Sequence, residues 1–289
     1  MALADVTGFS TAVTFGDAPA SKIPGTHRYL NLILKPQTNN MIRFFVFLLS
    51  CSVIFNSCHF MGHNRIRGNG TIKTENRTAT SFSSVDVSGN IDVYIKQDSA
   101  YSVRIETDEN LLPYIIIRTE GDRLVIEPKD HSNLSGTKDI KVYVSAPMFN
   151  KLEASGACSI SSENLLSSDA IDLELTGASN AKLEIKSPKV SAEITGASSA
   201  SLSGQTKDLD IDATGASHAK CFELLSENAE VDATGASSAE VFASVSLKGD
   251  ATGASHIRYK GAAIFKGGSS GAGSVSKVES KNLPSSGEY

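Results

Sequence analysis

The chain has no tryptophan, and only 7% of its 289 residues are aromatic. Globular cores usually depend on large rings for much of their buried area, so we expect small aliphatic side chains in a narrow, repetitive structure instead. The four cysteines have no metal-ligand spacing. The net charge is −5, which leaves no basic excess to attract nucleic acid. We therefore expect no nucleic-acid partner, no metal and no cofactor.

Signatures of catalysis are also missing. The sequence contains no nucleophile elbow, no phosphate-binding loop and no zinc-binding helix motif. Serines are plentiful, but they are spread through the chain rather than grouped with a histidine and an acid. These absences favour a protein that is not an enzyme.

The most informative feature present is a repeat. A Gly-Ala step, usually within Thr-Gly-Ala-Ser, recurs seven times at intervals of 18 to 21 residues. Its glycines are Gly156, Gly177, Gly196, Gly215, Gly235, Gly253 and Gly271. A fixed period of this size indicates a repeat architecture. A flexible linker is the alternative, but linkers do not keep apolar residues in register.

Each repeat has the pattern of short strands. The residues two and four before the glycine are mostly apolar and the residue between them is acidic, as in Leu173, Glu174 and Leu175. Leucine-rich repeats would need a leucine framework, and helical repeats a 3.6-residue period. The pattern instead predicts an all-β fold, a single-chain right-handed parallel β-solenoid (β-helix) with about 18–21 residues per coil. Glycine is expected at a corner where φ is positive or where coils approach closely.

The acids of six repeats would form one column along the solenoid: Glu153, Glu174, Glu193, Asp212, Asp232 and Asp250. Strand spacing would put neighbouring carboxylates about 4.8 Å apart, and like charges side by side on a sheet repel. The repulsion could be offset by basic residues of the other strand (Lys182, Lys220 and Arg258), by salt, or by bound cations such as Ca²⁺. The column is therefore a candidate cation- or ligand-binding surface, with a solvated face as the alternative.

Two cysteines and two histidines fall within the repeats. Cys158 and Cys221 lie three coils apart, about 14 Å by strand spacing, so they cannot form a disulfide and we expect buried free thiols. His218 and His256 would share a column two coils apart. Zinc sites use three or four protein ligands and no third ligand is evident, so the pair is interpreted as a solvated surface feature.

An apolar segment lies well upstream of the repeats. Arg43 follows Met41, and residues 44–55 are almost wholly apolar. The run is too short for a membrane-spanning helix, which needs about 20 residues, and is typical of the core of a secretory signal. We predict a lipoprotein-type signal peptide over residues 41–58. Residues 1–40 are then interpreted as a mis-annotated extension, with a disordered extension as the alternative.

The predicted signal ends in a cysteine. Ser57-Cys58 resembles the lipobox of bacterial lipoproteins, in which the cysteine carries the lipid, although Phe55 stands where Leu, Val or Ile is usual. Cys51 is preceded by a better match, but cleavage there would leave a very short apolar run. We assign lipidation to Cys58, with Cys51 as the alternative. Several acyl chains on one residue give stable membrane attachment.

Residues 68–150 have the pattern of further, less regular strands. Residues 85–89, Val-Asp-Val-Ser-Gly, reproduce the later repeat position by position. With residues 68–70, 82–84, 108–114 and 124–126, they resemble the "putative auto-transporter adhesin, head GIN-domain" family over about residues 68–278. The resemblance implies a β-solenoid domain of the kind found in Bacteroidetes lipoproteins, but it implies no catalytic residues, and the word adhesin rests on fold. The insistent Thr-Gly-Ala-Ser departs from the family's more usual Ser-Gly-Ser or Ser-Gly-Ala.

Together these segments predict an organisation and a function. The expected parts are an extension (1–40), a signal peptide (41–58), a tether (59–67), a GIN-type β-solenoid (68–278) and a C-terminal tail (279–289). We expect an exported, non-catalytic cell-envelope lipoprotein, anchored to the outer membrane, whose head binds a glycan or protein surface ligand. The alternatives are a carbohydrate-active enzyme of the parallel β-helix type, which needs carboxylates clustered with Arg or Lys on one exposed sheet, and a passive structural spacer. The sequence leaves the ligand and the oligomeric state open.

Overall fold

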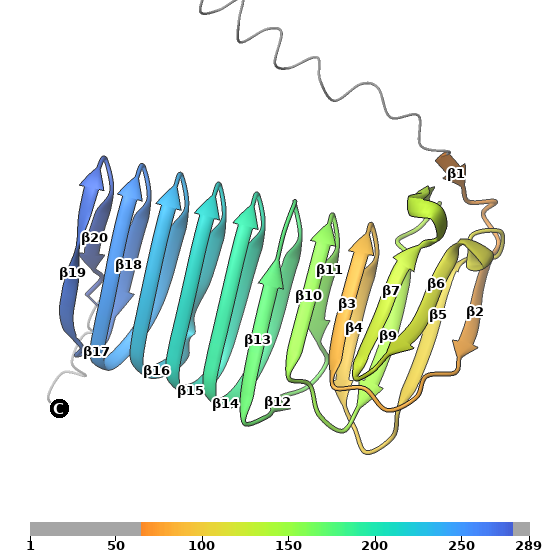
Figure 1. The fold of residues 1–289 in the computed structure, drawn as a ribbon, viewed down its shortest axis with the longest axis horizontal. Coiled ribbons are helices and arrows are strands. Elements are labelled where there is room, and N and C mark those ends of the chain that lie inside the picture. Colours follow the sequence, from red (N-terminus) through yellow and green to blue (C-terminus); the bar gives the residue numbers. More distant parts are fainter. Residues whose placement is uncertain (1–64, 280–289) are drawn as a thin grey trace, which may run out of the picture. The chain divides into compact units, whose positions relative to one another are not determined.

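The computed structural model describes residues 65–279, which form a right-handed parallel β-solenoid. In Figure 1 the coils advance from right to left, while front strands run upward and the strands behind them run downward. The predicted fold class is thereby confirmed. The predictions for residues 1–40 and 41–58, including lipidation at Cys58 or Cys51, lie outside the described residues. Within 65–279, no helix is long and apolar enough to cross a membrane.

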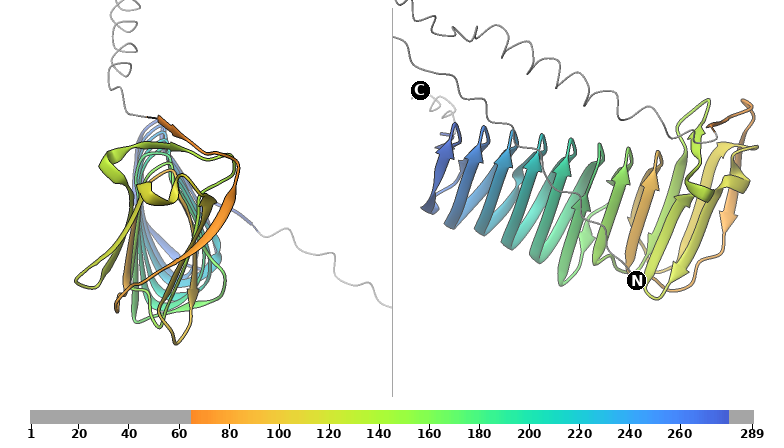
Figure 2. Two further views of the ribbon diagram at one scale, coloured as in Figure 1. Left: turned by 90° about the vertical axis from the view of Figure 1, so that its right-hand side faces the viewer. Right: turned by 45° about the horizontal axis from the view of Figure 1, so that its top comes forward.

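Two sheets face each other across a narrow core, as the end-on view in Figure 2 shows. The front sheet contains the strands that run up to the corner glycines, and the back sheet contains the strands that follow those glycines. The early coils use separate strands, namely β3 (Ser84–Gly89), β4 (Asp92–Gln97), β10 (Lys151–Gly156), β11 (Ser159–Ser162), β12 (Leu166–Ser167) and β13 (Ala170–Leu175). Later strands bend from the back sheet to the front sheet without a break, namely β14 (Asn180–Gly196), β15 (Ser199–Gly215), β16 (His218–Gly235) and β17 (Ser238–Gly253). The C-terminal end consists of β18 (His256–Lys260), β19 (Ile264–Gly271) and β20 (Ser274–Lys277).

Glycine forms one corner of each coil for two physical reasons. The seven repeat glycines and Gly89 have φ values between +70° and +99°, a region that side chains disfavour. They also stack in one column, because each glycine of a coil lies against the glycine of the coil before it. A Cβ atom on Gly196 would lie 2.5 Å from the carbonyl oxygen of Gly177. The corner therefore accepts only a residue without a side chain.

The core is filled by the residues that the alternation predicts to face inward. Leu173 and Leu175 are at most 1% exposed, and so are Ala192 and Ile194 one coil later. Inside the glycine corner, a buried serine column consists of Ser179, Ser198, Ser217, Ser237 and Ser255. Cys158 is buried in the corner of an earlier coil, and Cys221 is buried among core aliphatics. Both are free thiols, as predicted.

The N-terminal cap departs from the expected coil-after-coil order. In the front sheet β3 lies between β7 (Arg123–Pro128) and β10, and in the back sheet β4 lies between β9 (Lys141–Ala146) and β11. The chain therefore forms the interior coil of β3 and β4 before β7 and β9 add cap strands outside it. β6 (Ile115–Glu120) pairs antiparallel with β7, and β5 (Ser102–Asp108) pairs antiparallel with β9 and with β2 (Ile72–Arg77). Antiparallel strands need only short connections, which lets hairpins close this end of the core.

The cap is held at its edge by a buried carboxylate. Asp108 is fully buried and accepts hydrogen bonds from the backbone N–H of Gly70 (2.6 Å) and from the N–H and hydroxyl of Thr137 (2.8 Å each). Burial opposes ionisation of Asp108, but these hydrogen bonds outweigh it and lower the carboxyl pKa. Nearby, β1 (Arg65–Arg67) pairs with β8 (Asn133–Ser135). The last three residues of the predicted tether therefore belong to the domain, which also contains 3₁₀ turns at Leu112–Tyr114 and Lys129–His131.

Candidate ligand-binding face

The front sheet carries an uninterrupted column of carboxylates. Register pairing places Glu153, Glu174, Glu193, Asp212, Asp232 and Asp250 next to one another in successive coils. Asp86 adds a seventh carboxylate, because β3 pairs with β10 and brings Asp86 opposite Glu153. The predicted column did not include Asp86, although the match of residues 85–89 to the repeat held the signal for it. The repeat thus produces a continuous acidic stripe over seven coils.

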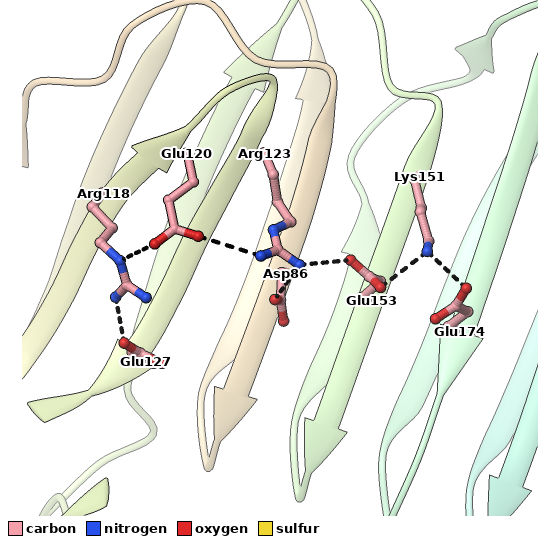
Figure 3. A network of polar contacts seen from close by, with 8 residues as sticks. All are labelled: Asp86, Arg118, Glu120, Arg123, Glu127, Lys151, Glu153 and Glu174. Carbon is pink, nitrogen blue, oxygen red and sulfur yellow. Dashed lines mark hydrogen bonds and ion pairs between the residues drawn. The ribbon is translucent and has the colours of Figure 1, made fainter. Parts of the chain in front are cut away.

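The N-terminal part of this column forms ion pairs with two basic residues of the same sheet. Arg123 lies 3.4 Å from Asp86 and 3.9 Å from Glu153, and Lys151 lies 3.1 Å from Glu153 and 2.7 Å from Glu174 (Figure 3). Hydrogen bonds from Lys151 to Glu174 and Glu153 raise the pKa of Lys151 to about 12, and the same bond lowers the pKa of Glu174. Glu174 is therefore ionised, paired and unsuited to donating a proton near neutral pH.

The basic residues expected to offset the column lie elsewhere. Lys182, Lys220 and Arg258 follow the corner glycines and belong to the back sheet, where Arg258 pairs with Glu240. The basic side chains that do pair with acids of the column come from positions where the repeat has no regularly recurring basic residue. Arg123 is on the β6–β7 hairpin of the cap, and Lys151 lies two residues before an acid of the column on β10.

The C-terminal part of the column lacks ion-pair partners in the described part of the chain. Within residues 65–279, Glu193, Asp212, Asp232 and Asp250 make no ion pair. Partial burial raises the pKa of Asp232, and repulsion from Asp250 adds to this. No group of three or more His, Cys, Asp or Glu side chains in the described part of the chain is arranged to hold a metal ion. The unpaired part of the stripe is thus an anionic surface.

A groove of about 680 Å³ lies beside this unpaired part of the column. Its lining combines charged residues, among them Lys189, Asp210 and Lys266, with the apolar Val245 and Ile264. Val245 is 55% exposed and Ile264 is 71% exposed, whereas the polar groups of the groove floor bond to one another. Asn228 donates to Asp208 (2.9 Å), and Ser246 donates to the amide oxygen of Asn228 (2.7 Å). The groove therefore offers apolar contact area beside a negatively charged stripe.

The remaining candidate residues do not converge on this face. His218 and His256 bond through Nδ1 to the hydroxyls of Ser238 and Ser274 in the following coils, each at 2.8 Å. Burial raises the pKa of the Cys158 thiol to about 11 and that of the Cys221 thiol to about 12. Both cysteines are therefore protonated at neutral pH and poor nucleophiles.

Comparison with known proteins supports the assignment of the fold. Three solved structures resemble this one: a "putative adhesin" from Bacteroides fragilis (TM-score 0.71, 18% identity), a "putative lipid binding protein" from Parabacteroides distasonis (0.64, 22%) and a "putative adhesin" from Parabacteroides merdae (0.63, 21%). The similar region covers 74% of this chain for the first structure and 75% for the other two. It includes 100% of each neighbour's chain. At these identities the likeness concerns the fold alone. No match was found among curated proteins.

A family model decides the classification. The model described as "Putative auto-transporter adhesin, head GIN domain" matches residues 81–263, more than half of the chain. The matched segment begins just before β3 and ends just before β19, so it includes the interior coil, most of the cap and nearly all of the regular coils. The chain therefore belongs to the GIN-domain family of adhesin-like β-solenoids.

Proposed function

We propose that this protein is a non-catalytic cell-envelope adhesin whose front sheet binds a partner protein or glycan through the groove beside the unpaired acids. The observation that carries the proposal is the exposure of Val245 and Ile264 in one groove together with charged side chains such as Glu230. Exposed apolar side chains within a hollow are typical of binding surfaces. The three acidic and three basic side chains that line the groove balance one another. The unpaired acids of the neighbouring column favour a ligand whose basic groups extend beyond the groove, because charge complementarity speeds encounter and excludes acidic competitors.

The family and the solved neighbours support this proposal, since their descriptions include the word adhesin. One neighbour is described as a lipid-binding protein, which keeps lipids within the set of ligands to test. The proposal also includes export and attachment to the outer membrane through a lipid on Cys58. Metabolic labelling with a palmitate analogue should mark the wild-type protein and Cys51→Ala but not Cys58→Ala. Persistent labelling of Cys58→Ala would show that the lipid is attached to another residue.

The groove itself is tested by binding to glycan, basic-peptide and lipid arrays. Val245→Ser and Ile264→Ser should each weaken binding of the retained ligand at least tenfold, because each removes apolar contact area. Leu225→Ser is the matched control, since Leu225 is 46% exposed and lies outside the groove. Equal binding by all four proteins would contradict the proposal. So would a lack of ligand on every array, which would favour the structural spacer.

One observation favours the competing enzyme function. Asp86, Glu153 and Glu174 cluster with Arg123 and Lys151 on an exposed sheet (Figure 3), which is the composition that polysaccharide-cleaving β-helices need. A general acid, however, requires a raised pKa, and Lys151 lowers that of Glu174. Burial raises the pKa of Asp86, and the charge of Arg123 offsets only part of this shift. Release of reducing ends from a polysaccharide panel, abolished by Arg123→Ala, would establish the enzyme instead.

A further inference from the structure

A second concave site lies on the back sheet of the cap, on the face opposite the acidic column. Four neighbouring strands, β2, β5, β9 and β4, bring Asn76, Arg104, Tyr143 and Tyr94 into one row. Each of these residues alternates along its strand with core residues, for example Tyr94 with Val93 and Ile95. The row therefore faces outward, and it combines two tyrosines with an arginine.

The aromatic part of the row is a stacked unit. The rings of Tyr94 and Tyr143 have centroids 5.2 Å apart and an interplanar angle of 20°. Arg104 places its guanidinium carbon 4.0 Å from the centroid of Tyr143, within the range of a cation–π interaction. This stack fixes the positions of two phenol groups and a guanidinium, so little side-chain entropy remains to be lost when a ligand binds.

Two groups in the stack have unused binding capacity. Arg104 has five N–H donors and makes no ion pair or hydrogen bond through its side chain within residues 65–279. Tyr94 stacks on Tyr143 with one face, and on its other side the register partner is the small Ser161. The outer face of the Tyr94 ring is therefore free of any aromatic or cationic partner in the described part of the chain.

A groove of about 290 Å³ follows this stack. Ser102 and Ser145 lie in its floor, with their hydroxyls 2.6 Å apart. On the same two strands, Arg104 and Tyr143 lie two residues away on the same face. Because the serines are small and these neighbours are large, the sheet surface is hollow here. The rim carries Lys96, which pairs with Asp98 at 3.0 Å, and Glu163. The four charged side chains of the groove, two basic and two acidic, balance one another.

This combination identifies a class of ligand. A pyranose ring has an apolar C–H face, which packs on an aromatic ring, and vicinal hydroxyls, which suit planar donors and carboxylate acceptors. The balanced charge of the groove gives no preference for uronic acids or sulfated sugars. We propose that this groove binds a neutral hexose-containing oligosaccharide, with one sugar packed on Tyr94 and bonded to Glu163, and a second sugar of the same chain bonded to Arg104. The site is separate from the front-sheet groove and does not rest on its function.

The test measures binding of the purified protein to neutral glucan, mannan and xylan oligosaccharides, and to polygalacturonate and hyaluronan as acidic glycans. The wild-type protein should bind a neutral glycan, and Tyr94→Ala and Arg104→Ala should each weaken that binding at least tenfold. Ser145→Leu should abolish it by filling the hollow while keeping the Tyr–Tyr–Arg stack. Tyr114→Ala is the matched control, since Tyr114 is an exposed tyrosine outside the groove.

Thermal melting of each variant separates loss of the site from loss of the fold, and only variants that melt like the wild type are scored. Ile264→Ser should leave binding at this site unchanged, which distinguishes it from the front-sheet groove. The proposal is overturned by an absence of binding to every neutral glycan, by binding confined to the acidic glycans, or by a neutral glycan that Tyr94→Ala and Ser145→Leu bind as tightly as the wild type.

Discussion

The corner glycines allow a quantitative test of what holds the coils together. In Gly196→Ala, the alanine must adopt a φ of +82°. Its Cβ would lie 2.5 Å from the carbonyl oxygen of Gly177 and 3.2 Å from the backbone nitrogen of Gly177. The left-handed conformation alone costs about 1–2 kcal/mol for alanine. The oxygen cannot retreat freely, because it accepts the hydrogen bond from the N–H of Ala197 at 2.7 Å, and loss of that bond costs about 1 kcal/mol more. With the strain of the close contact, we expect a total of about 3–4 kcal/mol.

A second glycine isolates the steric part of this cost. Gly121, in the turn between β6 and β7, has a φ of +66°, but nothing lies within 4 Å of the position of its Cβ. Gly121→Ala should therefore lose only the conformational part, about 1–2 kcal/mol. Urea unfolding followed by circular dichroism measures both losses. Hydrogen exchange then checks that Gly196→Ala loosens the coils on either side, as nearest-neighbour coupling in a solenoid requires. Equal losses in the two variants would refute the close-approach argument.

Two further predictions concern ionised carboxylates. Asp108→Ala leaves three donors without their acceptor, so it should destabilise the domain by at least about 3 kcal/mol. The pKa of Asp108 is lowered in the folded state. The ionised carboxylate therefore contributes its full share of the free energy of unfolding above the unfolded-state pKa of about 3.9, and this share is lost as the pH falls through the folded-state pKa. Urea midpoints measured from pH 2 to 7 should accordingly fall more steeply for the wild type than for the variant. Asp232→Asn should instead raise the melting temperature at pH 7 in low salt. Burial and the charge of Asp250 raise the pKa of Asp232, so the ionised carboxylate destabilises the folded state at pH values above that pKa. At acid pH the carboxyl group is protonated in both states, and the substitution should have no such effect. NaCl and CaCl₂ at matched ionic strength should reduce this difference in melting temperature equally. If Ca²⁺ stabilised the wild type more than Na⁺ did, and Asp232→Asn abolished that extra stabilisation, the column would be a cation site instead.

The regular coils could be predicted from the sequence because their information is local and repeated. Alternation within about ten residues decides which side chains enter the core, and the fixed period decides which residues become neighbours in the next coil. Leu173, Glu174 and Leu175 illustrate this, since two are buried and the third joins the acidic column. The corner opposite the glycines has no such signature. There the register of β16 against its neighbours shifts, for example between Cys221 and Leu225.

The cap could not be predicted in the same way, because its pairings join segments that share no repeat. Residues 85–89 match the repeat, yet nothing local indicates that β7, from later in the sequence, pairs on the outer side of β3. The ion pairs that Arg123 makes with the acidic column were missed for the same reason. Arg123 reaches Asp86 and Glu153 only because the β6–β7 hairpin folds back against β3.

This difference between coils and cap bears on where specific binding arises. A repeat stacks like residues on like, so the front sheet presents the same chemistry at every coil, as the carboxylates from Glu193 to Asp250 show. Such a surface suits an extended ligand that makes many similar contacts, and its affinity grows with the number of coils engaged. The cap breaks the repeat and places unlike residues side by side, Arg104 next to Tyr143 and Tyr143 next to Tyr94. A discrete ligand needs unlike groups at fixed positions, so selectivity for a particular sugar should reside in the cap even where the coils supply most of the contact area.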